Sequence, residues 1–409
     1  MNQLQIENKQ TKSSTIAVAM FGILNYIYID FVGQLRGSEL LALVTILIFG
    51  TLKTINQIAY LSNIMKGYIL LLLGLIVSDI YNQSQPIDFM KGWAMVIFGM
   101  LSTLFLTTQF IKNPKTIYIF LIFTFLASMV YNFSDAINLN KLSENSNFFK
   151  SKYKTTILPA VALITTLFWK NKKFFSIIFL LSCGFLFMKF DARSSGTGLI
   201  IAALILFIQT KKFNLQPKNI FYTFVVICFL SYGFYFYYVN LVLFHGFGGS
   251  NAQQLLLLEN PYNPINLIIQ GRSEIIVTIE AIKEKPLLGF GSWAKDKTGE
   301  YMRMLFVLFP QGAPNPSAII PKHSVLFGSW LWGGLSGVLG ALIIGWTMLS
   351  MFIKTFRVNF LLNPIITIYF VESVWHYFFS PIGHIRITFP FIIAILLTGI
   401  HIIRNNAKK

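Results

Sequence analysis

Apolar runs approaching 20 residues recur along this chain, and they limit its possible folds more than any other feature. A helix of about 20 predominantly apolar residues crosses the roughly 30 Å hydrocarbon core of a bilayer. Of the 409 residues, 55% are hydrophobic and only 12% are charged, a balance atypical of a soluble domain. A transmembrane barrel would need short segments of strict alternation instead. We therefore expect an all-α polytopic membrane protein, with one integral membrane domain over residues 1–409.

Hydropathy predicts about twelve transmembrane helices. Their expected ranges are 15–33, 38–52, 67–81, 90–111, 116–133, 155–169, 174–190, 197–210, 219–244, 324–353, 361–380 and 384–403. Connections from even to odd spans are short and purely basic, whereas those from odd to even spans mix acids and bases. By the positive-inside rule, both termini are expected to be cytoplasmic and the mixed connections to lie outside.

The net charge of +18 does not indicate nucleic-acid binding here. Its basic residues cluster in short loops, where membrane topology and the anionic headgroups of membrane lipids account for them. The two cysteines, Cys183 and Cys228, both lie within apolar spans, so neither a disulfide nor a metal site is predicted.

One long polar excursion, residues 244–322, interrupts the apolar pattern and is expected to form a large outer loop. It contains an apolar patch at Leu255–Leu258 and a Pro-rich loop at Phe309–Pro316. Arg272-Ser273-Glu274 opens a run that ends at Pro286, and its spacing predicts an amphipathic helix. The expected apolar face consists of Ile275, Ile276, Ile279 and Ile282.

Arg193, Arg272 and His323 are the predicted catalytic residues, and all three fall on outer-face connections. Guanidinium groups carry a permanent charge and bind phosphate oxygens in bidentate fashion. A histidine can take a proton from an alcohol at neutral pH. Together they suit transfer from a lipid-linked phosphate to a hydroxyl acceptor. No Asp-x-Asp pair or acid–histidine cluster occurs in the outer loops, so no metal or other cofactor is expected.

Each candidate also has a simpler role. Arg193 can anchor a span at the headgroups, Arg272 can pair with Glu274, and His323 can cap a helix start together with Ser324. The further substrate-binding candidates Arg303, Lys322 and Arg386 are more typical of interfacial anchors. Glu372 and His376 lie one helical turn apart within a span, where ionisable residues are functional candidates or a clamp between helices.

Three segments resemble the bacterial O-antigen ligase and polymerase superfamily of membrane glycosyltransferases. Asp191-Ala192-Arg193-Ser194-Ser195-Gly196 is similar to the family's Ser/Thr-Arg-Gly/Ala segment at a span mouth. Arg272 through Pro286-Leu287-Leu288-Gly289-Phe290-Gly291 is similar to its Arg, amphipathic helix and Pro-Leu-Leu-Gly-x-Gly element. His323-Ser324 followed by Gly334-Leu335-Ser336-Gly337 is similar to its His-Asn/Ser and Gly-Leu-x-Gly segments. The resemblance covers about the C-terminal half of the chain.

The resemblance implies a GT-C-type helical fold in the bacterial inner membrane, with a periplasmic active site. It also implies an undecaprenyl-diphosphate-linked glycan donor and metal-independent transfer. Arg193 and Arg272 would contact the donor diphosphate, and His323 would act as base or position the acceptor. Two departures from the family pattern are Trp332, where many relatives carry an acid, and Ala192, where Ser or Thr usually precedes the arginine.

These observations favour a ligase that passes the glycan to the lipid A core. A polymerase, whose acceptor is another lipid-linked repeat unit, is the alternative within the superfamily. A polytopic transporter of lipid-linked glycans is the alternative from another class. Such carriers typically show internal repeats and charges at the membrane midplane. Here no repeat is evident, and the charges concentrate on one face.

Overall fold

The structure of the chain is a computed structural model. It describes residues 2–407 except 32, 50–54, 56, 137–153, 191, 211–216, 247–254, 257, 309–318 and 359. The chain divides into two compact units, which are described one at a time. Unit 1 comprises Met1–Phe123, Arg272–Ile353 and Ser373–Lys409, and unit 2 comprises Thr124–Gly271 and Lys354–Glu372.

Unit 1 is helical apart from one short hairpin. Its elements are α1 (Asn2–Leu24), β1 (Tyr28–Asp30), β2 (Gln34–Arg36), α2 (Gly37–Phe49), α3 (Leu61–Tyr81), α4 (Pro86–Lys112), the start of α5 (Thr116–Ala136), α12 (Ser273–Glu284), α13 (Glu300–Leu308), most of α14 (Val325–Phe356), the end of α15 (Asn363–Phe379), α16 (His384–Ile387) and α17 (Phe389–Asn406). Strands β1 and β2 are antiparallel, with Ile29 opposite Leu35.

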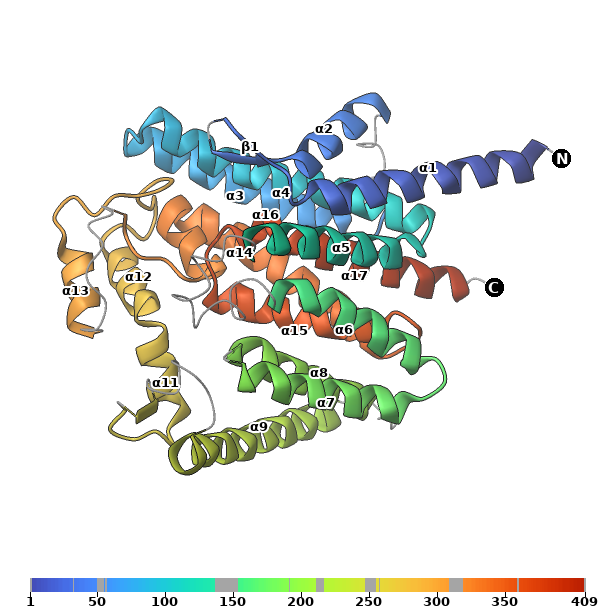
Figure 1. The fold of residues 1–409 in the computed structure, drawn as a ribbon. Helices are drawn as coiled ribbons and strands as arrows, with labels where there is room; N and C mark the ends of the chain where they lie inside the picture. Colours follow the sequence, from blue (N-terminus) through green and yellow to red (C-terminus); the bar gives the residue numbers. More distant parts are fainter. Residues whose placement is uncertain are drawn as a thin grey trace. The chain divides into compact units, whose positions relative to one another are not determined.

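Helix α4 is the central element of unit 1. It packs against α2, α3, α16 and α17 (Figure 1). Its C-terminal half from Leu101 to Phe110 is continuously buried. Helix α17 is likewise buried from Phe389 through Ile400. A helix that is apolar on all sides belongs either in a protein core or in a membrane. Helix α17 fits this rule, whereas five of the ten residues in the buried stretch of α4 are polar, and its Thr103 and Thr108 hydroxyls donate to the carbonyls of Gly99 and Phe105 at 2.8 Å.

Helices α3 and α14 approach closely because glycines line their contact. A Cβ atom on Gly74 would lie 2.6 Å from both the Gly333 carbonyl oxygen and the Gly337 nitrogen. Nearer the start of α3, a Cβ atom on Gly67 would lie 2.9 Å from the carbonyl oxygen of Gly340. Small residues at such spacing let helix backbones pack together without a hydrophobic driving force between them.

Helix α14 is broken at Gly334, whose φ of 60° and ψ of −151° are not helical. The loop Pro286–Gly291 inserts at this break. Its Phe290 and Gly291 nitrogens donate to the carbonyls of Leu331 and Trp332 at 2.7 and 3.1 Å, and the Leu335 nitrogen donates to the Leu287 carbonyl at 2.9 Å. The inserted loop thus supplies partners for backbone groups that the break removes from the helical ladder.

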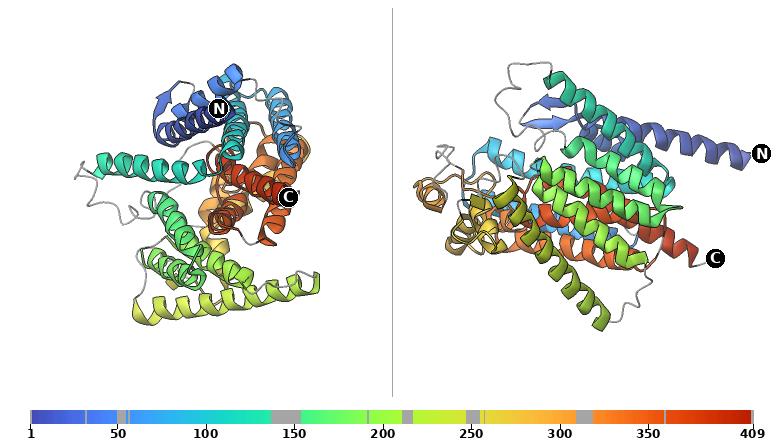
Figure 2. Two further views of the ribbon diagram at one scale, coloured as in Figure 1. Left: turned by 90° about the vertical axis from the view of Figure 1, so that its right-hand side faces the viewer. Right: turned by 60° about the horizontal axis from the view of Figure 1, so that its bottom comes forward.

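Unit 2 consists of packed helices. Its elements are the end of α5, α6 (Lys154–Trp169), α7 (Lys173–Lys189), α8 (Arg193–Thr210), α9 (Pro217–His245), α11 (Pro264–Gly271) and the adjoining parts of α14 and α15. Helices α7 and α8 run side by side (Figures 1 and 2). Their contact is close at Gly196, where a Cβ atom would lie 2.7 Å from the Gly184 carbonyl oxygen. Met188, Ile200 and Val239 belong to a buried apolar cluster that joins α7, α8 and α9.

The predicted helical membrane protein is confirmed in its coarse form. Within the described part of the chain, each expected span overlaps a helix, and five helices (α3, α4, α8, α14 and α17) are long and apolar enough to cross a membrane. The range expected for the first span, 15–33, is wrong at its end. Helix α1 stops at Leu24, because the β-branched and aromatic residues that follow pair as the hairpin Tyr28–Arg36.

Candidate functional site

Helix α12 and the extended segment Ile319–Ser324 form the candidate site in unit 1. Arg272 directly precedes α12 at its N-cap position, and the helix ends at Glu284, two residues before Pro286, as the sequence predicts. The predicted apolar face is partly wrong, since Ile279 is exposed whereas Val277, Thr278 and Ala281 are buried. The reason is Thr278, whose hydroxyl donates to the Pro321 carbonyl at 2.8 Å and turns this face toward the extended segment.

The extended segment is fixed on its other side by the loop after Gly291. The Ile320 nitrogen donates to the Ala294 carbonyl at 2.9 Å, and the backbones of Lys295 and Ile319 form an isolated antiparallel β-bridge. Successive side chains of an extended segment point to opposite sides. Lys322 and His323 accordingly meet different partners, so two neighbours in sequence contribute to two different environments.

His323 faces α12, where its Nδ1 lies 3.5 Å from Glu274 Oε1. Both side chains are partly exposed. The capping role considered for His323 falls instead to Ser324, whose hydroxyl accepts a hydrogen bond from the Phe327 nitrogen at 3.2 Å and donates to the Tyr377 carbonyl. The imidazole therefore pairs with a carboxylate rather than with the helix start.

Arg272 belongs to the same group of charges. Its guanidinium carbon lies 5.7 Å from the centroid of the Trp375 ring, a cation–π contact. Partial burial lowers the pKa of His323, the Glu274 charge raises it, and the charges of Arg272 and Lys322 lower it further. A lowered pKa favours the neutral imidazole, the form that accepts a proton near neutral pH. The structure thus brings Arg272, Glu274 and His323 into one cluster.

Lys322 points to the opposite side and is enclosed by two indoles. Its Nζ lies 3.2 Å from the centroid of the Trp332 ring and 4.4 Å from that of Trp293. Within the described part of the chain the amine is buried without a hydrogen-bond partner. Burial holds the pKa of Lys322 well below its usual range, and the charge of Asp88 opposes that shift. Trp332 and Trp293 thus form two walls around the Lys322 amine.

A network of hydrogen bonds holds the loop after α12 on α3 and α4. The Asp79 carboxylate accepts from the Ser292 nitrogen at 2.6 Å, from the Ser292 hydroxyl at 2.8 Å and from Trp93 Nε1 at 2.8 Å. Asn82 Nδ2 donates to the Gly289 carbonyl at 3.0 Å. Buried carboxylates are stable only when such donors compensate for their lost hydration. The network fixes the position of the neighbouring Trp293.

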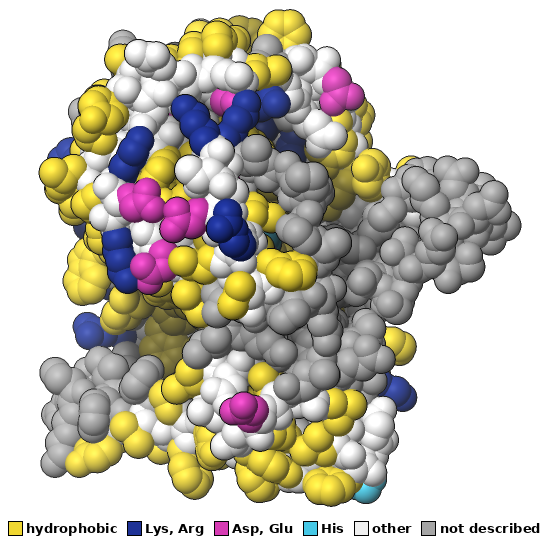
Figure 3. Space-filling view, turned by 90° about the vertical axis from the view of Figure 1, so that its left-hand side faces the viewer, with side chains coloured by type: hydrophobic (Ala, Val, Ile, Leu, Met, Phe, Trp, Pro, Cys, Tyr) yellow, Lys and Arg dark blue, Asp and Glu magenta, His cyan; other side chains and the backbone are white. Residues whose placement is uncertain are grey.

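A polar cleft of about 640 Å³ opens next to this loop. Figure 3 shows acidic and basic side chains gathered on the face that carries α13. The cleft itself is lined by amides, carboxylates, lysines and aromatic rings, which include Asn82, Gln85, Asp88, Glu284, Lys285, Lys295, Asp296, Phe290, Trp293 and Tyr301. Lys295 Nζ lies 2.8 Å from Gln85 Oε1 and 3.7 Å from Asp88 Oδ2.

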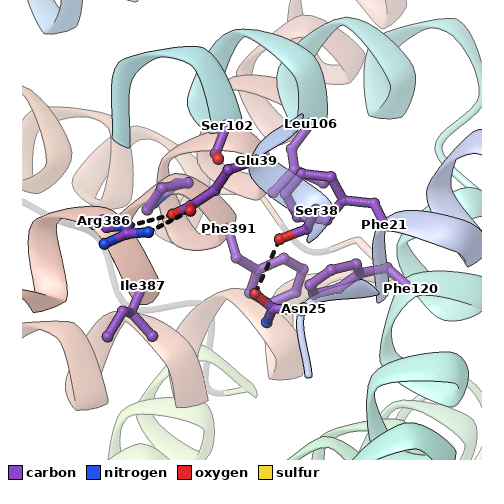
Figure 4. A pocket seen from close by; sticks show the side chains of 11 residues that line it. Phe21, Asn25, Ser38, Glu39, Ser102, Leu106, Phe120, Arg386, Ile387 and Phe391 are labelled. Carbon is purple, nitrogen blue, oxygen red and sulfur yellow. Dashed lines mark hydrogen bonds and ion pairs between the residues drawn. The ribbon is translucent and has the colours of Figure 1, made fainter. Parts of the chain in front are cut away.

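Arg386 forms an ion pair with Glu39, which is buried at the start of α2 (Figure 4). Its Nε and Nη2 donate to the two carboxylate oxygens, and Nη2 also donates to the Gln34 carbonyl at 2.8 Å. Arg386 thereby joins the hairpin to α16. The substrate contacts of Arg386 and of Arg303 stay predictions. Arg303 is exposed on α13.

Arg193 is the first residue of α8, in unit 2. Asp191, two residues before Arg193, lies outside the described residues. The same is true of residues 137–153 and of the Pro-rich loop from Phe309 to Pro316. Two residues after Arg193, the Ser195 hydroxyl donates to Glu372 Oε1 at 3.3 Å. The expected convergence of Arg193 with Arg272 and His323 stays a prediction, because they belong to different units.

His376 stacks on His384 in unit 1, with ring centroids 3.7 Å apart and an interplanar angle of 16°. Their Nδ1 atoms lie 2.8 Å from the Ser380 hydroxyl and 2.7 Å from the Thr388 hydroxyl. Among the described residues, no group of three or more His, Cys, Asp or Glu side chains is placed to hold a metal ion.

Sequence reasoning missed the two indoles around Lys322. Trp293 does carry a visible signal in the structure, because its φ of 55° is rare for a residue with a Cβ atom. Nothing in the sequence marks that conformation.

No family model matches this chain. Comparisons with curated proteins and with solved structures likewise gave no match.

Proposed function

We propose that the chain is a glycosyltransferase that moves a glycan from a lipid-linked diphosphate to a hydroxyl acceptor. The observation that carries the proposal is the cluster of Arg272, Glu274 and His323 beside the start of α14. It combines a permanent cation with a histidine–carboxylate pair, and its histidine has a lowered pKa. Such a set suits the departure of a phosphate and the removal of a proton from an alcohol.

In the proposed reaction, the acceptor oxygen attacks the anomeric carbon of the donor sugar, and the bond from that carbon to the diphosphate oxygen breaks. The bonding electron pair leaves with the diphosphate, whose growing charge is stabilised by Arg272. The acceptor proton passes to His323 Nε2, because Nδ1 faces Glu274. Glu274 then stabilises the imidazolium that forms. Arg193 is the second proposed contact to the diphosphate.

The finer features of the proposal follow the family resemblance. They are twelve spans with both termini cytoplasmic, a bacterial inner membrane, a periplasmic site and an undecaprenyl diphosphate donor. Five helices long and apolar enough to cross a membrane support the membrane location in general terms. We propose the ligase type, with lipid A core as acceptor, and the polymerase type as its alternative.

The test is glycan transfer by the purified full-length protein in detergent. A lipid-linked donor is supplied with either lipid A core or a second lipid-linked unit, each with and without EDTA. The variant is His323→Ala, and Lys283→Met is the matched surface control, because Lys283 pairs with its helix neighbour Glu280 in a solvent-exposed contact.

We expect transfer that survives EDTA, is retained in the control and falls at least a hundredfold in His323→Ala, the scale on which general bases contribute. The productive acceptor would separate ligase from polymerase. Wild-type failure with both acceptors, accompanied by movement of the donor across vesicle membranes, would replace the proposal with the transporter. Equal rates in wild type and His323→Ala would refute the role of the histidine.

A further inference from the structure

A groove of about 630 Å³ lies in unit 1 between the hairpin, α4 and α16. Its apolar walls include Phe31, Leu35, Met90, Met95, Phe98 and Ile387. The side chains of Phe31, Met90 and Ile387 are exposed, so the groove is open along an apolar edge. Its volume equals that of about 20 water molecules at about 30 Å³ each, and a methylene group is about as large as a water molecule. The groove therefore has room for one hydrocarbon chain but not for several.

Two cations, Lys91 of α4 and Arg386 of α16, line the same groove, and no carboxylate belongs to its described lining. The hairpin brings the two cations together through consecutive residues. A Cβ atom on Gly33 would lie 3.5 Å from Lys91 Cε, and the Gln34 carbonyl accepts a hydrogen bond from Arg386 Nη2 at 2.8 Å. The part of the groove beside the hairpin is therefore cationic.

Both cations keep hydrogen-bond donors for a further acceptor. A guanidinium has five N–H groups, and Arg386 uses three of them, from Nε and Nη2, on the Glu39 carboxylate and the hairpin carbonyl. The two N–H groups of Nη1 have no acceptor among the described residues, and the Arg386 side chain is 20% exposed. Within the described part of the chain no carboxylate pairs with Lys91, because Asp88, the one acid of α4, pairs with Lys295 instead.

The two cations lie where lipid headgroups are expected. Helices α4 and α17 are long and apolar enough to cross a membrane; Lys91 lies in the second turn of α4, and Arg386 lies in α16, directly before α17. Trp293 also lines the groove, with its ring centroid 5.8 Å from Lys91 Nζ. Lysine, arginine and tryptophan are typical of the membrane–water interface. Met95 and Phe98 follow Lys91 at i+4 and i+7, so the apolar wall continues from the cations toward the middle of α4.

We propose that this groove binds one anionic glycerophospholipid of the bilayer. Its phosphodiester accepts hydrogen bonds from Lys91 and from Nη1 of Arg386, one acyl chain lies along Met95 and Phe98, and the second chain stays in the bilayer. A zwitterionic headgroup would bring an ammonium group next to two cations, with no carboxylate in the groove to receive it. Charge complementarity therefore selects a headgroup that lacks a positive charge, such as phosphatidylglycerol.

The inference goes beyond the proposed function and does not rest on it, because this lipid is neither donor nor acceptor in the proposed reaction. A lipid held by Lys91 and Arg386 would join α4 to α16 across the hairpin. Because the site exists only in the folded protein, binding should raise the temperature of thermal unfolding.

The experiment measures lipid binding to the full-length protein in detergent by native mass spectrometry. The probes are phosphatidylglycerol and phosphatidylethanolamine with identical acyl chains, and undecaprenyl phosphate is the competing arm. Lys91→Met removes one cation, and Lys91→Arg keeps the charge. Ala94→Trp fills the groove, which Ala94 lines, and leaves both cations in place. Lys283→Met is the surface control, and thermal unfolding without added lipid checks the fold of every variant.

We expect the wild type to bind one phosphatidylglycerol per chain at least fivefold more tightly than phosphatidylethanolamine. Lys91→Met should weaken the binding of phosphatidylglycerol about fivefold, the scale of one basic residue near an anionic lipid surface. It should leave phosphatidylethanolamine unchanged, whereas Lys91→Arg and Lys283→Met should bind both lipids as the wild type does. Ala94→Trp should weaken both lipids alike, because it removes room for the chain.

Several outcomes would overturn the site. Equal binding of the two phospholipids by the wild type, or unchanged binding of phosphatidylglycerol by Lys91→Met, would exclude selection by charge. Unchanged binding by a folded Ala94→Trp would place the lipid elsewhere. Should Ala94→Trp fail to fold, the Lys91 variants decide the matter in the same way. Tighter binding of undecaprenyl phosphate than of phosphatidylglycerol would overturn the phospholipid as occupant.

The same measurement separates this site from the proposed reaction. His323→Ala should lose transfer yet bind phosphatidylglycerol as the wild type does, because His323 does not line the groove. Protein that binds phosphatidylglycerol through Lys91 but transfers no glycan would refute the proposed function and leave the lipid site standing.

Discussion

Gly334→Ala should destabilise unit 1 strongly, because the break in α14 has no room for a side chain. A Cβ atom there would lie 2.1 Å from the Leu287 carbonyl oxygen, and the φ of 60° is itself strained for alanine. The strained backbone costs about 1–3 kcal/mol, and overpacking costs a similar amount. If the loop Pro286–Gly291 moved away from the break to make room for the alanine, its three backbone hydrogen bonds to α14 would be lost, at about 0.5–1.5 kcal/mol each. Either response gives a loss of about 2–5 kcal/mol.

Hydrogen exchange of the purified protein measures this loss where it occurs. The amides of Phe290, Gly291 and Leu335 should exchange more than tenfold faster in the variant, since each tenfold change corresponds to about 1.4 kcal/mol. Gly328→Ala is the matched control in the same helix, because its new Cβ atom would lie 3.4 Å from Ile382 Cβ, an ordinary contact. Equal protection of the three amides in both variants would refute the reasoning.

Two further predictions concern charged pairs. Arg386→Met should cost about 3–5 kcal/mol by removing the ion-pair partner of buried Glu39, which keeps a hydrogen bond from the Arg36 nitrogen at 2.9 Å. Adding Glu39→Met should recover part of that stability; thermal unfolding measures both, and a double variant as unstable as the single one would contradict the pairing. For the proposed reaction His323 must be neutral, so transfer should fall as the imidazole becomes protonated at acid pH. Because the pKa of His323 is lowered, the midpoint of that fall should lie below about 6.5, the ordinary pKa of histidine. Glu274→Gln removes a charge that raises this pKa, so the acid limb of the kcat/KM profile should move to lower pH, and a shift to higher pH would exclude the pair. Stability has the same sign, since the unfolded chain takes up the proton at a higher pH than the folded one and folding weakens as the pH falls.

Local sequence signals predicted the helices and much of the outer loop. Arg272 does open a helix that stops before Pro286, because proline lacks the amide that continues the ladder. The hairpin at Tyr28–Arg36 was missed, since its apolar residues extend the hydropathy of α1 without a break. The buried face of α12 was also misjudged, because Thr278 is fixed by the carbonyl of Pro321, which is distant in sequence.

Part of the candidate site was within reach of the sequence. Arg272 and His323 were selected by residue type and by their place at helix starts, and the structure places both beside Glu274. The box around Lys322 was not predictable. It depends on Trp293 and Trp332, whose positions are set by a hydrogen-bond network and by a loop inserted into a helix break.

The sequence by itself determined that this chain is a helical protein with apolar spans and one long polar excursion. Those properties follow from composition and from periodicities of a few residues, which local backbone geometry makes readable. Only the tertiary structure decided that the Pro286–Gly291 loop meets Gly334 and that Lys322 and His323 face opposite sides of one segment. Such contacts join residues far apart in sequence, and their energies depend on fit between surfaces that no local pattern encodes.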